Sequence, residues 1–398
     1  MLTKNVWCRK CTGVAVSLLV VAMHPAEAGD FTTGHQFAVS ENGAATVSIP
    51  VQVPRGIAGM EPQLAFNYSS SSGNGLIGLG WSLSGPSAIT RCPKNMAADG
   101  ERGRVSFDAG DRYCMDGQRL EPVATNGNAD GVYGTQGTSY RTERDSFSRV
   151  TATGGAFAGQ STVPNTFRIE TKAGLILDFG LTANSRVMTN RAAGLGANTI
   201  NRWMLQRITD RTRKGNFVEF VYCAGEVSVD GTACNSAAWT GSVVPHYIRY
   251  TNRDGVLNGE FAVLFGYESR PDRVQVFYLG SGSRQTQRLS KVMTYRDFGG
   301  ANASGVVQPG QLVRTYSVGY DALEVGNASV RATNVSRVAS ITESGADGQS
   351  LPALRFTLAS DAVFGQAVTQ RQVAQPGTPV PSPSCGGVFG NRVSLQCR

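Results

Sequence analysis

Residues 43–91 read GAATVSIPVQVPRGIAGMEPQLAFNYSSSSGNGLIGLGWSLSGPSAITR, and this stretch decides the fold class. Apolar and polar residues alternate over 47–53 and again over 64–68, which is the two-residue period of half-buried strands. Pro50 has no N–H group, so the first strand is expected at a sheet edge or with its prolyl nitrogen facing away from a partner. The glycines of SSSSGNGLIGLG permit positive φ and close backbone approach, and Trp81 then supplies one large anchor. The stretch therefore predicts strands joined by tight turns, and not a site of chemistry.

The composition agrees with a β architecture. The chain has 398 residues, of which 41% are hydrophobic, so it can form a large core as one all-β unit or as two domains. With 48 glycines and 17% charged residues, it is richer in turns and poorer in charge than a helical protein.

The N-terminus has the pattern of a signal peptide. Lys4, Arg9 and Lys10 precede an apolar run over 14–23, and Ala-Glu-Ala over 26–28 predicts cleavage between Ala28 and Gly29. An uncleaved anchor is the alternative, but the run has about half of the roughly 20 residues that a spanning helix needs. We expect export by the general secretory route, to the periplasm, the cell surface or the medium, with no membrane span after cleavage.

Six cysteines follow the signal, and an even number in an exported protein predicts disulfides. Six cysteines allow fifteen connectivities, and sequence alone does not choose among them. Local pairing is our expectation: Cys92 with Cys114, Cys223 with Cys234, and Cys385 with Cys397. Zinc and a catalytic cysteine are both disfavoured, because only His35 and His246 remain beside them.

Charge and motifs exclude several functions. Without the signal, the chain has 34 basic residues (37 − 3) and 28 acidic ones (29 − 1). The arginines are scattered along the sequence and do not form the basic cluster that is typical of nucleic-acid-binding proteins. The G-x-G-x-x-G match at 73–78 lacks a following helix and predicts a turn. NGNADG at 126–131 resembles a calcium loop, but Gly137 stands where the bidentate glutamate belongs. Asp108, Asp111 and Asp116 are interpreted as turn residues. We expect no catalytic residue, metal or cofactor.

Further strands are expected along the rest of the chain, with almost no helix between them. One includes Val105 and Phe107, another includes Tyr113, and a hairpin turns at 173–174. The remaining predicted strands cover 140–150, 166–171, 175–179, 203–210, 217–222, 247–251, 261–267, 274–278, 289–295, 313–320, 335–343 and 354–358.

Several motifs occur in the order typical of one family. The opening stretch, then DRYCMDGQRL, YRTERDSFSRV, WMLQRITDRTRKGNFVEFVY and ESGADGQSLPALRFTL, resembles the N-terminal region shared by SpvB-type virulence proteins, B components of insecticidal toxin complexes and related Rhs/YD-repeat proteins. The resemblance covers about 34–358. It implies an all-β fold of many short antiparallel strands and hairpins, forming a large curved sheet or partial shell that can hold a toxic polypeptide. Eight residues of these motifs are expected to be structural: Gly59, Pro62, Tyr68, Gly78, Gly80, Trp81, Asp116 and Gly117.

The chain departs from these relatives toward its C-terminus. The expected organisation is a signal peptide at 1–28, an all-β region at 29–372, a proline-rich linker at 373–384 and a short tail at 385–398. An ADP-ribosyltransferase like those of the relatives would need a Glu-x-Glu pair, and the chain has none.

Three functions remain possible. The favoured one is a noncatalytic structural module whose partner is a YD-repeat or toxin polypeptide, in cis or in trans. The second is a surface-binding module for glycan or host protein that uses exposed aromatics such as Trp239 or Tyr247, although such side chains more often pack in the core. The third is an enzyme without a recognisable motif.

Overall fold

The structure is a computed structural model. It describes residues 33–125, 128–129, 133–189, 198–212, 215–236, 242–251, 259–278, 281–321, 335–357, 388–389 and 393–394. Strands make up most of this part, and the helices described there are α1 (Met96–Asp99) and the 3-10 turns η1 (Ile57–Gly59) and η2 (Ala183–Ser185). The predicted all-β class is confirmed.

Eight antiparallel strands close into a barrel, which the sequence did not predict. The strand β17 (Ile200–Asp210) pairs along one edge with β15 and along the other with β7, so the ring has no open side. At 11 residues, β17 is long enough to pair with two strands on each edge, and β16 (Arg186–Met188) also joins it. The other barrel strands are β7 (Ala88–Cys92), β8 (Arg112–Met115), β9 (Gln118–Pro122), β12 (Ser139–Thr142), β13 (Arg149–Phe157), β14 (Gln160–Glu170) and β15 (Leu175–Phe179).

Aromatic side chains fill the barrel. Trp203 packs edge-on against Tyr113 and Phe167, with ring centroids 5.2 and 5.1 Å apart, and Tyr133 stacks on Tyr113. The indole N–H of Trp203 donates to the carbonyl of Pro164 at 3.0 Å, so its one polar group is satisfied. The barrel interior is therefore a packed core.

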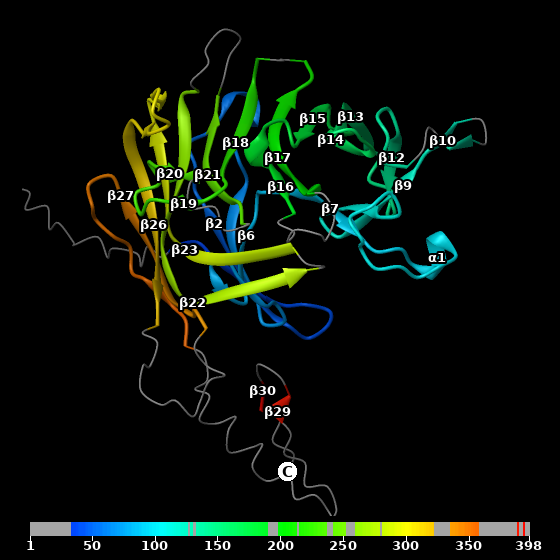
Figure 1. Ribbon diagram of the computed structural model, residues 1–398. Helices are drawn as coiled ribbons and strands as arrows, with labels where there is room; N and C mark the ends of the chain where they lie inside the picture. Colours follow the sequence, from blue (N-terminus) through cyan, green and yellow to red (C-terminus); the bar gives the residue numbers. More distant parts are fainter. Residues whose placement is uncertain are drawn as a thin grey trace, which may run out of the picture. The chain divides into compact units, whose positions relative to one another are not determined.

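A long open sheet leaves the barrel from β17, as the green-to-orange strands in Figure 1 show. Its first strand is β18 (Phe217–Cys223), which pairs with β17 along the same edge as β7 does. Its sequence FVEFVYC is mostly apolar, and the strand is largely buried. The antiparallel order continues through β21 (Val244–Tyr250), β22 (Phe261–Tyr278), β23 (Ser281–Arg296), β26 (Gln311–Tyr320), β27 (Val338–Gly345) and β28 (Leu354–Arg355).

The opening stretch and the strand just before it form a second layer on this sheet. The strands of this layer are β1 (Gln36–Val39), β2 (Ala45–Val51), β3 (Leu64–Ser69) and β6 (Trp81–Leu83), in that order. Phe66 packs on Tyr316 of β26, whose hydroxyl also accepts the N–H of Gln52 at 3.0 Å. Pairing of β1 with β2 stops at Ser48, so Pro50 has a partner strand on one side only, in agreement with its missing N–H.

Short hairpins complete the described part. They are β4 (Asn74–Gly75) with β5 (Gly78–Leu79), β10 (Ala124–Thr125) with β11 (Asn128–Ala129), β19 (Glu226–Val227) with β20 (Cys234–Asn235), β24 (Gly300–Ala301) with β25 (Val307–Gln308), and β29 (Val388–Phe389) with β30 (Val393–Ser394). In the part of the chain that the structure describes, no helix has the length and apolar character to cross a membrane.

Three strand predictions were wrong in detail. The segment 140–150 contains two strands, β12 and β13, joined by a loop. Val105 and Phe107 are buried but lie in a loop, because the N–H of Ser106 donates to Asp111 at 2.7 Å and not to a neighbouring strand. The predicted strands 261–267 and 274–278 are parts of one strand, β22.

Candidate interaction site between two open sheet edges

The glycine-rich segment after β3 is fixed by a buried ion pair on β22. The guanidinium of Arg270 donates to Asp272 at 2.9 Å and to the carbonyl of Gly75 at 2.7 Å, and it also bonds to Asn74. Asp272 in turn accepts from Asn74 at 2.9 Å and from the N–H of Ser336 at 2.7 Å. Burial alone would raise the pKa of Asp272, but the bonds from Arg270, Ser336 and Asn74 outweigh it and hold this pKa well below its usual value.

Two predicted glycines are required by this packing. A Cβ on Gly78 would lie 2.5 Å from the carbonyl oxygen of Ser336, and one on Gly80 would lie 2.5 Å from the ring of Tyr68. Both residues also have positive φ. The segment therefore forms the β4–β5 hairpin and delivers Trp81 to the core beside Tyr68, with ring centroids 5.4 Å apart.

The other predicted structural residues lie in turns or in the core. Asp116 and Gly117 both have positive φ and link β8 to β9 as a two-residue turn, and Asp116 accepts the hydroxyl of Ser87 at 2.6 Å. Gly59 has φ 74° in η1, and Pro62 is buried.

The structure contains two disulfides, Cys92–Cys114 and Cys223–Cys234. The first joins β7 to β8 in the barrel, and the second spans the loop that carries β19. Cys385, Cys397 and the cleavage position Ala28–Gly29 lie outside the described residues, as do Trp239 and most of the 126–131 loop.

Titratable side chains that could suggest chemistry have structural contacts. Asp111 forms a buried ion pair with Arg91 at 2.8 Å, and Asp108 accepts the N–H of Gly110 at 2.7 Å. Among the described residues, no group of three His, Cys, Asp or Glu side chains could hold a metal ion. Tyr247, a candidate aromatic of the surface-binding alternative, is buried against Phe298, as such side chains more often are. It packs in a cluster with Phe298 and with Val307 of β25, so it does not support that alternative.

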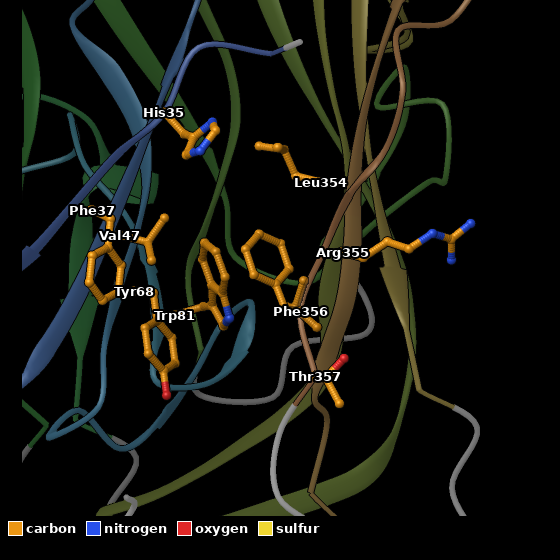
Figure 2. A pocket seen from close by; sticks show the side chains of 10 residues that line it. His35, Phe37, Val47, Tyr68, Trp81, Leu354, Arg355, Phe356 and Thr357 are labelled. Atoms are coloured by element: carbon orange, nitrogen blue, oxygen red, sulfur yellow. The ribbon is translucent and has the colours of Figure 1, made fainter. Parts of the chain in front are cut away.

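An apolar groove of about 530 Å³ separates β1 from β28. Figure 2 shows Phe37, Val47, Tyr68 and Trp81 on one wall, and Leu354 and Phe356 on the other. Trp81 and Phe356 meet edge to face at the base of the groove, with centroids 4.8 Å apart. Phe37 is 68% exposed, so the large sheet covers the apolar face of the four-stranded sheet only in part.

Both walls of the groove end in open strand edges. The N–H of Phe356 donates to Ala339 in β27, and backbone groups of successive strand residues point to opposite edges, so those of Arg355 face away from β27. The N–H of Ser40 likewise donates to Ala44, which leaves the backbone groups of Phe37 and Val39 on the outer edge of β1. Within the described residues, no strand pairs with either outer edge.

Sequence reasoning missed the ion pair on β22 and the groove. Arg270 and Asp272 lie about 200 positions from Asn74 in the chain, and no local pattern links them. The sequence signals for the groove were the apolar alternation over 47–53 and 64–68 and the predicted strand 354–358, which indicated strands but not that their side chains line an exposed groove.

Over the residues that the structure describes, these features define an all-β module with a filled barrel, an open sheet and an apolar edge that no other described strand covers. Residues 39–254, more than half of the chain, match the family described as SpvB, Salmonella virulence plasmid 65kDa B protein. The chain belongs to this family, as its motifs predicted. No curated protein matched the chain.

Solved structures of toxin proteins share the fold. The TcdB2-TccC3 crystal structure has a TM-score of 0.57 at 19% identity, and the match covers 82% of this chain but 17% of that one. The structure of the Photorhabdus luminescens Tc holotoxin pore has a TM-score of 0.56 at 18% identity, and the match covers 82% of this chain and 16% of that one. The N-terminal domain of SpvB from Salmonella typhimurium strain LT2 has a TM-score of 0.52 at 17% identity, and the match covers 78% of this chain and 99% of that one. The chain thus spans about a sixth of the Tc chains and nearly all of the SpvB domain.

Proposed function

We propose that this protein is a noncatalytic structural module of an exported, toxin-related protein, which adds β-structure to a shell that encloses or assembles with a toxin polypeptide. The observation that carries the proposal is the edge of the large sheet at β28, which no strand of the described residues covers and which lies above an apolar groove. A sheet that ends in this way offers main-chain hydrogen bonds and apolar surface to another chain.

The proposed partner is a YD-repeat or toxin polypeptide, joined in cis or supplied in trans. Family membership and the fold shared with Tc toxin components support a protein partner. The two disulfides support export, because disulfides persist in oxidising compartments.

Size-exclusion chromatography with light scattering tests the proposal. The mature chain, from residue 29, is run alone and mixed with the YD-repeat protein encoded nearest to its gene. A stable complex of the two proteins is the expected result. A monomer that ignores every such protein would contradict the proposal and would favour the glycan-binding or host-binding alternative.

A further inference from the structure

We propose that the outer edge of β28 accepts one extended strand of a partner polypeptide, with apolar side chains on its groove face and an acidic side chain on its opposite face. The inference rests on the proposed function and deepens it, because it states the chemistry of the partner segment.

The backbone supplies the first part of the argument. Arg355 directs its N–H and C=O groups away from β27, toward the position of an added strand, because its neighbour Phe356 donates to Ala339 in β27. No proline or bulge blocks this edge in β28, and the strand carries only one charge. An added strand would therefore continue the antiparallel ladder of β26, β27 and β28.

The groove supplies the second part. Leu354 and Phe356 line it from β28, and Phe37 and Val47 line it from the opposite layer. Every second side chain of an added strand would enter the space between these two walls. Because the walls are largely apolar and no carboxylate lines them, those side chains are expected to be aliphatic or aromatic.

Arg355 supplies the third part of the argument, because its charge favours an added strand with an acidic side chain. Its side chain points away from the groove in Figure 2, it is exposed, and none of the described residues forms an ion pair with it. A carboxylate directly opposite it on an added strand would form a cross-strand ion pair. A second copy of this chain is disfavoured, because pairing β28 with itself would bring two Arg355 side chains together on one face.

A designed peptide tests this chemistry. The probe is fluorescein-labelled TVTVEVTVT, whose valines share one face and whose glutamate lies on the other, and the control peptide has lysine in place of the glutamate. Fluorescence anisotropy with the mature chain is expected to show the glutamate peptide binding about 3-fold more tightly than the lysine peptide. Arg355→Glu should reverse this preference.

The apolar part has its own matched pair of variants. Phe37 and Phe277 are both 68% exposed, but only Phe37 lines the groove. Phe37→Ser should weaken peptide binding about tenfold, because apolar area is no longer buried, whereas Phe277→Ser should leave it unchanged.

Three results would overturn the inference. One is a peptide preference that Arg355→Glu does not alter, and another is a chain that dimerises through this edge. The third is peptide binding that appears only after residues 358–398 are removed, which would make the chain's own continuation the occupant. If the YD-repeat protein binds the wild type and the Phe37→Ser and Arg355→Glu variants equally, the groove assignment fails while the proposed function stands. If it does not bind the wild type, the proposed function fails.

Discussion

The structure predicts that the fold loses stability in mild acid because of one buried histidine. His246 lies in β21 at a bulge between pairs Tyr222–Pro245 and Val221–Tyr247, and it is 3% exposed. It is hydrogen-bonded to the backbone of Gly231, but its Nε2 has no partner among the described residues. Burial lowers the pKa of His246 from 6.5 to about 4, against a smaller opposing effect of the Gly231 bond.

The sign follows from proton binding. Because the histidine of the unfolded chain has the higher pKa, the unfolded state binds the proton first. Proton binding therefore stabilises the unfolded state relative to the folded state as the pH falls below 6.5. The folded state loses about 1.4 kcal/mol by pH 5.5, and about 3 kcal/mol once the pH is below 4. Above about pH 7.5 the histidine is neutral in both states and contributes almost no pH dependence.

Urea unfolding between pH 7.5 and 5.5, with intact disulfides, measures this effect. Wild type should lose about 1.4 kcal/mol over this interval, whereas His246→Phe should lose much less. His35→Gln is the control, because His35 is exposed beside the groove, and it should follow the wild type. Equal losses in wild type and His246→Phe would refute the assignment of the acid sensitivity to His246.

Three further predictions concern the contacts that hold the fold. Asp272→Ala leaves the buried guanidinium of Arg270 without its carboxylate and should lower the free energy of unfolding by about 3–5 kcal/mol, measured by urea denaturation; a loss below about 1 kcal/mol would show that the ion pair is not needed. Gly80→Ala should cost at least 2 kcal/mol, roughly, because its Cβ would meet Tyr68 at positive φ, whereas Gly117→Ala, also at positive φ but with open space around it, should cost less. Equal melting temperatures for these two glycine variants would contradict this. Replacing Cys92 and Cys114 by serine opens a loop with a sequence separation of 22 and should cost about 3 kcal/mol in the chain-entropy account, and unchanged denaturation would argue against a contribution from this disulfide.

Local patterns predicted the strands well where side chains alternate between core and solvent. Residues 64–68 and 175–179 are predicted strands that correspond closely to β3 and β15, and Gly174 in the predicted turn at 173–174 has positive φ. The Asp116–Gly117 turn also carries its own local signal. These features depend on neighbours a few positions away.

Features that depend on distant pairing could not be predicted in this way. Barrel closure needs Trp203 beside Ile89, which are more than a hundred positions apart, and nothing in either segment specifies the partner. Val105 and Phe107 alternate like a strand, yet the bond from Ser106 to Asp111 holds them in a loop at the barrel. Alternation reports that a side chain is buried, but not which backbone it pairs with.

The same distant contacts bear on what counts as the folding unit. The family match ends at residue 254, but the apolar face of the matched opening stretch is covered by later strands. Phe66 packs on Tyr316, Trp81 packs on Phe356, and Asn74 is held by Asp272. A fragment that ends at 254 would expose these residues and leave the β4–β5 hairpin without its ion pair, so its four-stranded layer has too little buried surface to remain folded. The glycine-rich opening stretch therefore acquires its structure from the end of the large sheet, which also carries the proposed binding edge.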